Sequence, residues 1–417
     1  MKLADIIDSF ISGDWGEEYP TQDTPNAAYC VRGADIVPIT NHNFTDIPQR
    51  YVCDRTKETK LLAVGDLVIE KSGGSPTQST GRIVYVAEDL IKAKGNVVCS
   101  NFCTAFRVKA GWNPLYVYYF WQNVYNHDAF FNFEGKTSGI KNLQLDNALS
   151  AIDIEYLPLE KQNQIVASLA SIDEKINVNR QINDNLEAMA KQLYDYWFVQ
   201  FDFPNEEGKP YKSSGGVMVW NEKLKREIPQ EWSDCKHKDY INLFDSKRVP
   251  LSSKDRGERQ GVYPYYGATG IMDYVNDYIF DGDYILLAED GSTSDAKGFP
   301  IVQYIWGKNW VNNHAHIILP KNERYMMFTY QMLRSIPAKQ IETGSIQKKI
   351  SQENLYGYKM VLPNSDLLEK YENVVSPLWE KRKRCIEEIN TLTKQRDELL
   401  PLLMNGQATV NYHLSAC

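Results

Sequence analysis

Residues 157–198 read LPLEKQNQIVASLASIDEKINVNRQINDNLEAMAKQLYDYWF, and this stretch predicts one uninterrupted helix. Pro158 suits the first position of a helix, and neither Gly nor Pro follows it before Pro204. A helix of this length spans about 60 Å and therefore needs a partner of similar length. Its apolar residues recur at the 3.5-residue spacing of a coiled-coil seam, with two Asn in the same register. The seam positions are Ile172, Ile176, Asn179, Asn183, Leu186, Leu193 and Trp197.

A second stretch of the same kind begins at Leu362-Pro363 and ends in RDELLPLLMNG. Polar residues at seam positions weaken a coiled coil but fix its register. We expect the two helices to pack antiparallel, because a short linker then joins the end of the first helix to the segment that follows; parallel packing is the alternative. The second seam consists of Leu378, Cys385, Ile389, Leu392 and Leu399, interrupted by Arg382 and Arg396.

The segments that precede the two helices, residues 1–156 and 217–361, repeat the same short motifs in the same order. In each, a Gly-Asp pair precedes a strand-like run, a polar loop, a second Gly and another strand. Four matches in one order, each set followed by a long helix, indicate an internal duplication. The matched positions are Gly65 and Gly282, Gly81 and Gly298, Asn101 and Asn313, and Gly139 and Gly344.

Composition places the chain among globular proteins with several domains. Of 417 residues, 43% are hydrophobic and 12% aromatic, which is enough for packed cores. No apolar run is long enough for a membrane span, the N-terminus does not resemble a targeting segment, and seven scattered cysteines suit a reducing cytoplasm. The net charge of −8 weighs against a free-standing nucleic-acid binder, so any DNA surface must be local or completed by partners.

Motifs for catalysis are absent or incomplete. Gly135-Lys136-Thr137 resembles the end of a phosphate-binding loop, but Phe130 stands where that loop requires Gly. His314 and His316 share one face of a predicted strand; a metal pair is one interpretation, and hydrogen-bonded imidazoles are the favoured one. We therefore expect no catalytic residue and no metal site.

Several strings taken together resemble the specificity (S) subunit of type I restriction–modification systems, over essentially the whole chain. That resemblance implies two target recognition domains, each reading one half of a split DNA sequence, with the helices as a spacer. It also implies docking of two modification (methyltransferase) subunits and a motor-nuclease restriction subunit. S-adenosylmethionine, ATP and magnesium would belong to those partners, leaving this chain non-catalytic and without a cofactor. The strings are LPLEKQNQIVASLASIDEKI, YDYWFVQFDFPNEEGKPYKSSGG, YPYYGATGIMDYVNDYIFDGDYILLAEDG, NNHAHII and RDELLPLLMNG.

The expected fold is α+β, with two similar globular domains separated by two long antiparallel helices and related by an internal pseudo-two-fold repeat. Two similar but non-identical readers would bind a bipartite, non-palindromic target in double-stranded DNA. The expected parts are target recognition domain 1 (1–156), the first long helix (157–203), a linker (204–216), target recognition domain 2 (217–361), the second long helix (362–405) and a C-terminal tail (406–417).

Candidate DNA contacts lie in polar, turn-forming loops that occur in both repeats. Base edges are read by amide, hydroxyl and cationic side chains, whereas phosphates are bound by Lys, Arg and backbone N–H groups. The alternative is that these loops are solvated hairpins. The candidates in the first repeat are Ser72, Gly73, Gly74, Ser75, Thr77, Gln78, Ser79, Arg82, Asn101, Lys136, Ser138, Lys141 and Asn142; those in the second are Ser292, Thr293, Ser294, Lys297, Asn313, Ser345, Gln347 and Lys348.

Aromatic residues cluster where the first helix meets the linker, and we expect them to be exposed and to bind a partner subunit. The alternative is that they close the end of the coiled coil. They are Tyr194, Trp197, Phe198, Phe201 and Phe203.

Two other classes of function compete with DNA recognition. A duplicated coiled-coil adaptor without DNA contact would explain the acidic charge and the helices, but not the paired polar loops. A fused restriction–methylation enzyme would need methyltransferase and nuclease motifs that the sequence lacks.

Overall fold

The computed structural model describes residues 1–73, 78–137, 140–344 and 348–408. The chain forms two compact units. The first unit contains Met1–Gln181 and Cys385–Cys417, and the second contains Ile182–Arg384. Each unit therefore combines one globular block with a segment of each long helix, so the unit boundaries differ from those expected for the domains.

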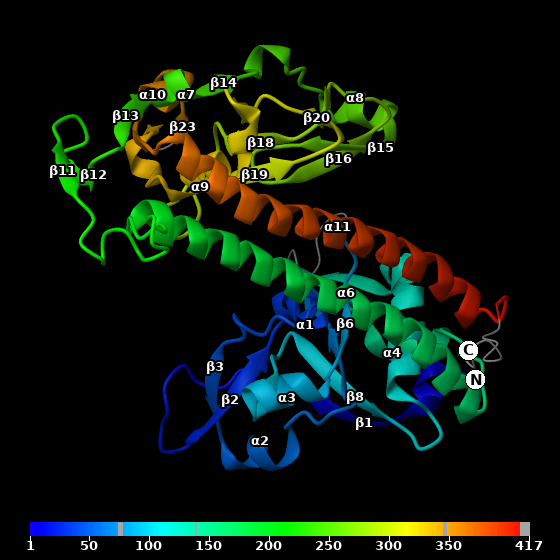
Figure 1. Ribbon diagram of the computed structural model, residues 1–417. Helices are drawn as coiled ribbons and strands as arrows, with labels where there is room; N and C mark the ends of the chain where they lie inside the picture. The colour runs from blue at the N-terminus through cyan, green and yellow to red at the C-terminus, as the bar shows by residue number, and fades with distance from the viewer. Residues whose placement is uncertain (74–77, 138–139, 345–347, 409–417) are drawn as a thin grey trace, which may run out of the picture. The chain divides into compact units, whose positions relative to one another are not determined.

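The long helices are α6 (Leu159–Tyr194), which continues into a π-helical turn (Asp195–Val199), and α11 (Ser365–Met404). Within each unit a segment of α6 lies beside a segment of α11 (Figure 1). The pairs run in opposite directions: Asp173 contacts Arg396 and Asn179 contacts Glu388 in the first unit. In the second unit Glu187 contacts Arg382, at 2.7 Å. The helices are antiparallel, as expected.

Polar residues of the predicted seam form bonds between the helices. The Asn179 amide donates to Glu388 at 3.0 Å, and the guanidinium groups of Arg396 and Arg382 bind Asp173 and Glu187. Because each bond requires a particular opposite residue, these pairs fix the register of the two helices.

Within its described residues the first unit contains three sheets. The largest is antiparallel with the order β1-β8-β4-β6, and the second has the order β3-β2-β7 with β2 parallel to β7. A third sheet, β5-β10-β9, carries a hairpin. The strands are β1 (Ile7–Ser12), β2 (Asn26–Val31), β3 (Gln49–Val52), β4 (Leu67–Glu70), β5 (Ser72–Gly73), β6 (Ile83–Tyr85), β7 (Val97–Cys99), β8 (Cys103–Val108), β9 (Glu134–Thr137) and β10 (Ile140–Leu143); the helices are α1 (Ile36–Thr40), α2 (Asp54–Thr59), α3 (Glu88–Lys94), α4 (Pro114–Asn126) and α5 (Leu145–Ala151).

The second unit repeats this topology, which confirms the internal duplication. Its antiparallel sheet has the order β14-β21-β18-β19, and in the sheet β16-β15-β20-β17 strand β15 is parallel to β20. A hairpin, β22–β23, follows at the same point in the chain order as β9–β10. The strands are β11 (Met218–Asn221), β12 (Arg226–Pro229), β13 (Ser233–Lys236), β14 (Ile241–Leu243), β15 (Gln260–Tyr266), β16 (Ile271–Val275), β17 (Phe280–Asp281), β18 (Tyr284–Ala288), β19 (Val302–Ile305), β20 (Lys308–Val311), β21 (Ala315–Pro320), β22 (Glu342–Thr343), β23 (Lys349–Ile350) and β24 (Lys359–Leu362); the helices are α7 (His237–Tyr240), α8 (Ser253–Glu258), α9 (Met326–Ser335) and α10 (Gln352–Gly357).

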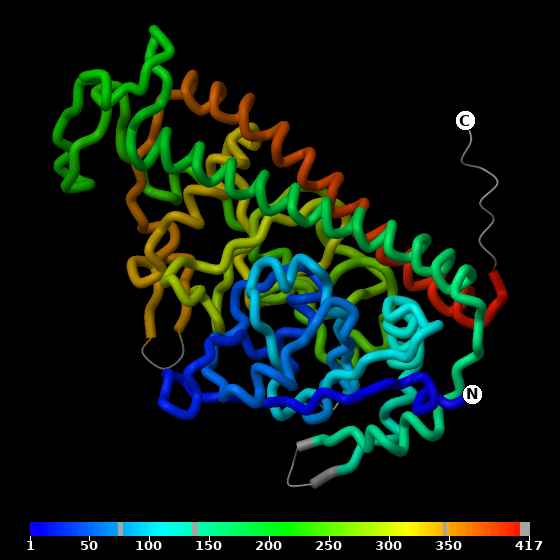
Figure 2. The backbone as a smooth tube through the Cα atoms, turned by 90° about the horizontal axis from the view of Figure 1, so that it is seen from below, coloured from blue at the N-terminus to red at the C-terminus, as the bar shows by residue number. Residues whose placement is uncertain are grey.

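The N-terminus closes the first unit. Lys2 pairs with Asp153 just before α6, and the N–H of Ile154 donates to the carbonyl of Met1 at 2.8 Å (Figure 2). In the second unit, β13 pairs with β24 just before α11. The same junction thus joins each globular block to the start of its own long helix.

The long helices contribute to the core of each unit. In the first unit, Leu169 of α6 and Leu400 of α11 are buried in one cluster with Trp121. In the second unit, Phe198 packs with Tyr371 and Trp379 of α11. Burying each of these side chains stabilises the fold by about 1.5–3 kcal/mol, so each globular block is held firmly on the helix pair.

The expected linker, residues 204–216, is mostly exposed, and a few contacts anchor it to the end of the first long helix. Tyr211 stacks on Phe203 with ring centroids 4.6 Å apart. The backbone N–H and the hydroxyl of Ser213 both donate to Asp202, at 2.7 and 2.6 Å.

Within the described ranges, no helix combines the length and apolar character needed to cross a membrane.

Candidate nucleic-acid interface

In the first unit the polar loop after β4 and the β9–β10 hairpin meet. Strand β5 pairs with β10, and the backbone N–H of Thr80 donates to the Glu134 carboxylate at 2.7 Å. The Lys141 ammonium binds the other oxygen of Glu134 at 2.9 Å. We call Thr80, Glu134 and Lys141 the first clasp. It joins two segments that the sequence marks separately as DNA-contact candidates.

The second unit contains the same arrangement. The Thr293 hydroxyl donates to Glu342 at 2.6 Å, and the Lys348 ammonium binds the second oxygen of Glu342 at 3.2 Å. We call Thr293, Glu342 and Lys348 the second clasp. Both threonines are fully buried, so each holds its loop against the hairpin from inside.

The two clasps differ in how far their lysines are exposed. The Lys141 side chain is 15% exposed and lies over the Phe131 ring, whereas Lys348 is 51% exposed. Burial raises the pKa of the Glu342 carboxyl, but hydrogen bonds from Thr293 and Ser294 and the Lys348 ammonium outweigh it and hold that pKa below its usual range. Glu342 is therefore ionised at neutral pH, and Lys348 remains accessible to a phosphate.

Sequence reasoning missed Glu134 and Glu342. Each glutamate follows an aromatic or aliphatic residue and precedes a short Gly-containing polar string, FEGKTSG and IETGS. That recurrence was the available signal. Glutamate is a poor candidate for DNA contact, however, and its role in joining two loops depends on tertiary approach.

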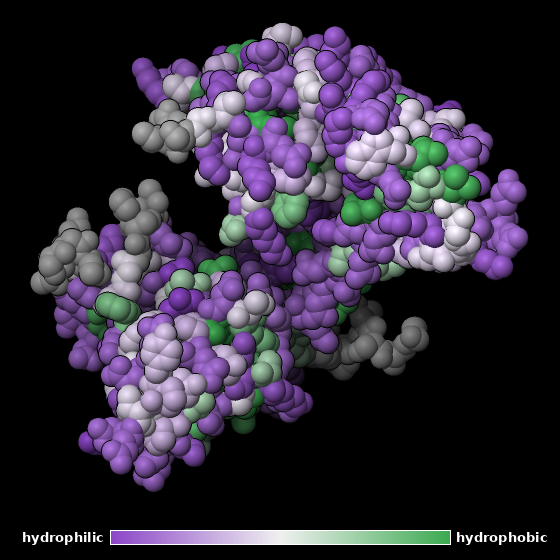
Figure 3. Space-filling view, turned by 90° about the vertical axis from the view of Figure 1, so that its left-hand side faces the viewer, coloured by the Kyte–Doolittle hydropathy of each residue, from purple (hydrophilic) through white to green (hydrophobic). Residues whose placement is uncertain are grey.

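Several predicted contact residues lie on the surface around the clasps. The face drawn in Figure 3 is mainly hydrophilic, with apolar side chains scattered in small groups. Strand β5 approaches β10 closely, with 2.5 Å between the Ser72 hydroxyl and the side-chain oxygen of Asn142, and Gly73 lies opposite Lys141. Ser294 is half-buried and lies 3.3 Å from Lys348. The exposed candidates are Gln78, Asn101, Ser292, Lys297, Asn313 and Lys348.

Three predicted contact residues are buried or half-buried in their units. Arg82 forms a two-pronged ion pair with buried Glu70 at 2.8 and 2.6 Å, so its guanidinium is already engaged. Ser79 and Thr293 are buried. Gly74, Ser75, Thr77, Ser138, Ser345 and Gln347 lie outside the described residues, as does the side chain of Lys136.

The turns before β8 and β21 lie beside the clasps. The carbonyl of Phe102 accepts the N–H groups of Lys71 and Ser72, at 2.8 and 3.1 Å. In the second unit the carbonyl of His314 accepts the N–H of Glu289 at 2.8 Å. Asn101 and Asn313, aligned by the sequence repeat, thus occupy equivalent turns.

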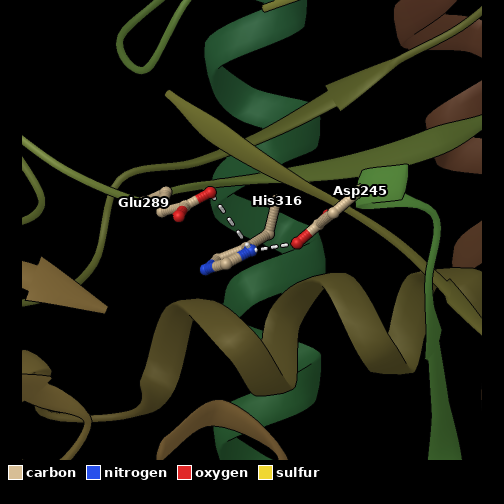
Figure 4. Close-up of side chains that lie close together, drawn as sticks. All are labelled: Asp245, Glu289 and His316. Atoms are coloured by element: carbon tan, nitrogen blue, oxygen red, sulfur yellow. Dashed lines mark hydrogen bonds and ion pairs between the residues drawn. The ribbon is translucent and has the colours of Figure 1, made fainter. Parts of the chain in front are cut away.

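His314 and His316 bind different partners, as expected for hydrogen-bonded imidazoles. His314 is half-exposed and contacts Asp290 at 2.6 Å. His316 is fully buried, and its Nδ1 lies 2.6 Å from Asp245 (Figure 4). Its Nε2 lies 2.8 Å from the carbonyl of Ile350. Both ring nitrogens of His316 are therefore engaged within the fold.

Asp245, Glu289 and His316 have donor atoms close enough to share a metal ion. The Arg248 guanidinium already lies 2.6 Å from Glu289 and 3.5 Å from Asp245. Burial raises the pKa of Asp245, but hydrogen bonds from His316, Ile317 and Gln352 outweigh it and hold that pKa below its usual range. Because the Arg248 guanidinium already supplies a cation to this cluster, we interpret the cluster as a charged link within the fold.

The aromatic cluster at the end of α6 is buried, so the expected exposure of these side chains is wrong. Phe198 contacts Phe328 and Tyr371 with ring centroids 4.8 Å apart. These contacts match the alternative, in which the aromatics close the end of the helix pair. The five side chains have exposed fractions of 3–9%: Tyr194, Trp197, Phe198, Phe201 and Phe203.

Exposed apolar residues lie instead on the neighbouring β11–β12 hairpin. Val219 is 37% and Trp220 57% exposed. Leu224 in the hairpin turn lines a cleft of about 980 Å³ together with Met332 and Ile336. The hairpin thus presents exposed apolar side chains beside a cleft that both polar and apolar side chains line.

The family model described as the type I restriction modification DNA specificity domain matches residues 37–188 and 229–372. The MjaIX specificity subunit of Methanocaldococcus jannaschii is 24% identical over 285 residues, covering 63% of this chain and 62% of that protein. The putative specificity subunit S.HindORF215P of Haemophilus influenzae is 32% identical over 142 residues, covering 34% and 35%. The chain thus matches less than two thirds of the length of either relative.

Among solved structures, the S subunit of a type I restriction–modification system from M. genitalium aligns with a TM-score of 0.55 and 15% identity. The alignment covers 97% of this chain and 95% of that one. At this identity the likeness shows a shared fold along nearly the whole chain.

Proposed function

The chain belongs to the type I restriction–modification DNA specificity family, and on this premise we propose that it reads the DNA target of a type I restriction–modification complex. The target is bipartite and non-palindromic, with one half read by each repeat. Methyltransferase and restriction subunits, which carry S-adenosylmethionine, ATP and magnesium, act where this subunit places them. This chain itself is non-catalytic and works in the cytoplasm.

The clasps are the observation that carries the proposal. In each repeat a buried threonine and a glutamate hold a polar loop against a lysine-bearing hairpin. An adaptor without DNA contact would not need a polar loop fixed against a lysine-bearing hairpin in both repeats. Backbone N–H groups and lysines suit phosphates, and amide and hydroxyl side chains suit base edges.

Methylome sequencing tests this function. Cells that carry the chain with an active modification subunit should gain one methylated motif, composed of two short defined halves around a fixed gap. Replacing residues 1–156 by the corresponding domain of a relative should change one half only. Absence of any motif, with a modification subunit shown to be active, would favour the adaptor alternative.

We also propose that the modification subunit docks on the β11–β12 hairpin and the cleft beside it. Trp220→Ala should weaken binding of that subunit while leaving the fold intact, because Trp220 is exposed. Trp197→Ala is the matched control and should destabilise the second unit, because Trp197 is 7% exposed. Normal binding by the Trp220 variant would rule out this docking surface.

A further inference from the structure

Two turns at equivalent points of the repeat carry chemically different side chains. Asn101–Phe102 follows β7 and precedes β8, and Asn313–His314 precedes β21 after β20. Strands β7 and β20 are each the parallel neighbour of another strand, β2 and β15 respectively. The backbone environment of the two turns is therefore the same, whereas the second residue is Phe in one and His in the other.

Each turn is attached to the hairpin of its own unit. The carbonyl of Phe102 accepts the N–H of Ser72, and Ser72 lies opposite Asn142 of β10. In the second unit, His314 contacts Asp290, which forms a bridge with Lys349 of β23. Both turns therefore lie next to the loop and the hairpin that the clasp of their unit joins.

Neither side chain contributes to a core. Phe102 is 57% exposed, and the His314 side chain is 49% exposed. The Nδ1 of His314 faces Asp290 at 2.6 Å, while Nε2 has no hydrogen-bond partner among the described residues. One turn thus presents an apolar ring, and the other a ring with one free hydrogen-bonding nitrogen.

We propose that Phe102 and His314 are specificity-determining residues that give the two repeats different base preferences. The inference rests on the proposed function. Phe102 makes an apolar contact in a groove, for which the thymine methyl group is the partner of matching chemistry. His314, oriented by Asp290, forms a hydrogen bond from Nε2 to a base edge. Replacing the side chain at this one turn position, with the backbone unchanged, would change the preferred base without any rearrangement of the domain.

The test compares methylated motifs of the full chain co-expressed with its active modification subunit. Phe102→Ala should relax one base position in one half of the motif by about tenfold, and His314→Ala should relax one position in the other half. Val64→Ala and Lys321→Ala are matched controls. Both residues are exposed; Val64 precedes β4 and Lys321 follows β21, at the strand ends away from the two turns. Both controls should leave the motif unchanged.

Two conservative variants separate reading from general loss of structure. Phe102→Leu keeps an apolar contact and should retain most of the preference, and His314→Gln should retain more than His314→Ala. Folded alanine variants that methylate the wild-type motif, or that weaken both halves equally, would overturn the inference while leaving the proposed function intact. A wild-type chain that directs no motif with an active modification subunit would overturn both.

Discussion

In each unit a buried side chain near the start of a long helix accepts a backbone N–H from the beginning of a shorter helix, but the chemistry of the acceptor differs. In the first unit, the neutral side chain of Gln162 on α6 accepts the N–H of Asn113, the residue that caps α4, at 2.8 Å. In the second unit, the Glu372 carboxylate on α11 accepts the N–H of Phe328 in the first turn of α9, at 2.8 Å. Both acceptors are buried, so each satisfies a backbone donor that water cannot reach.

The same contrast recurs in the sheets. The second residue of β8 is Thr104, whose hydroxyl donates to the carbonyl of Ile11 at 3.1 Å. The second residue of β21 is His316, which is bound to the Asp245 carboxylate. At these two pairs of positions the repeat thus uses neutral hydrogen bonds in the first unit and ionisable groups in the second. We expect the second unit to respond more strongly to charge removal and to pH.

The largest effect is expected from breaking the charged link of the second unit. His316→Ala removes a fully buried ring and its hydrogen bond to the Asp245 carboxylate, and should lower the free energy of unfolding of this unit by about 3–5 kcal/mol. The matched change, Thr104→Ala, removes one neutral hydrogen bond and should cost about 1 kcal/mol. Hydrogen exchange of β21 and β8 measures both. Equal losses would contradict the contrast between the units.

The repeat and the helices could be predicted from the sequence because their signals are local. The seam of Ile172 and Ile176 has a period, and Asn101 and Asn313 mark the same point in a matched order. Burial of the α6 aromatics could not be predicted in this way. A cluster such as Trp197-Phe198 has the same composition whether it faces a partner or its own core, and only the packing of α9 and α11 against it decides.

The clasps could not be predicted from the sequence for a related reason. Thr80 and Glu134 are far apart in the chain, as are Thr293 and Glu342, and their contacts arise from tertiary approach. The loops on either side were recognisable as polar and repeated. The hydrogen bonds and ion pairs that join these loops depend on how the hairpins pack against the sheets, which local sequence patterns do not determine.

A smaller effect is expected from pH at Glu372. Burial raises the pKa of this carboxyl to about 7, above its value of roughly 4.3 in an unfolded chain. The folded unit therefore retains a proton that the unfolded chain releases, and its stability falls as pH rises from about 4.5 to about 7, by about 2–3 kcal/mol.

Glu372→Gln should flatten this dependence in urea unfolding, because the amide oxygen still accepts from Phe328 and no proton is exchanged. The reciprocal change, Gln162→Glu, should introduce a similar fall with pH in the first unit. Wild-type protein whose second unit is equally stable at pH 5 and pH 8 would show that Glu372 ionises freely in the fold.

The smallest effect should come from the clasps, and there the order of the units reverses. Glu134→Gln removes the counter-charge of Lys141, which is 15% exposed and cannot turn fully into water, so we expect a loss of about 1–2 kcal/mol. Glu342→Gln leaves Lys348, which is 51% exposed, free to be solvated, and should cost less than about 1 kcal/mol. Hydrogen exchange of the β9–β10 and β22–β23 hairpins compares the two. A larger loss in the second hairpin would mean that Lys348 is held by more than its exposure indicates, and would remove the argument that it is the more accessible of the two lysines to a DNA phosphate.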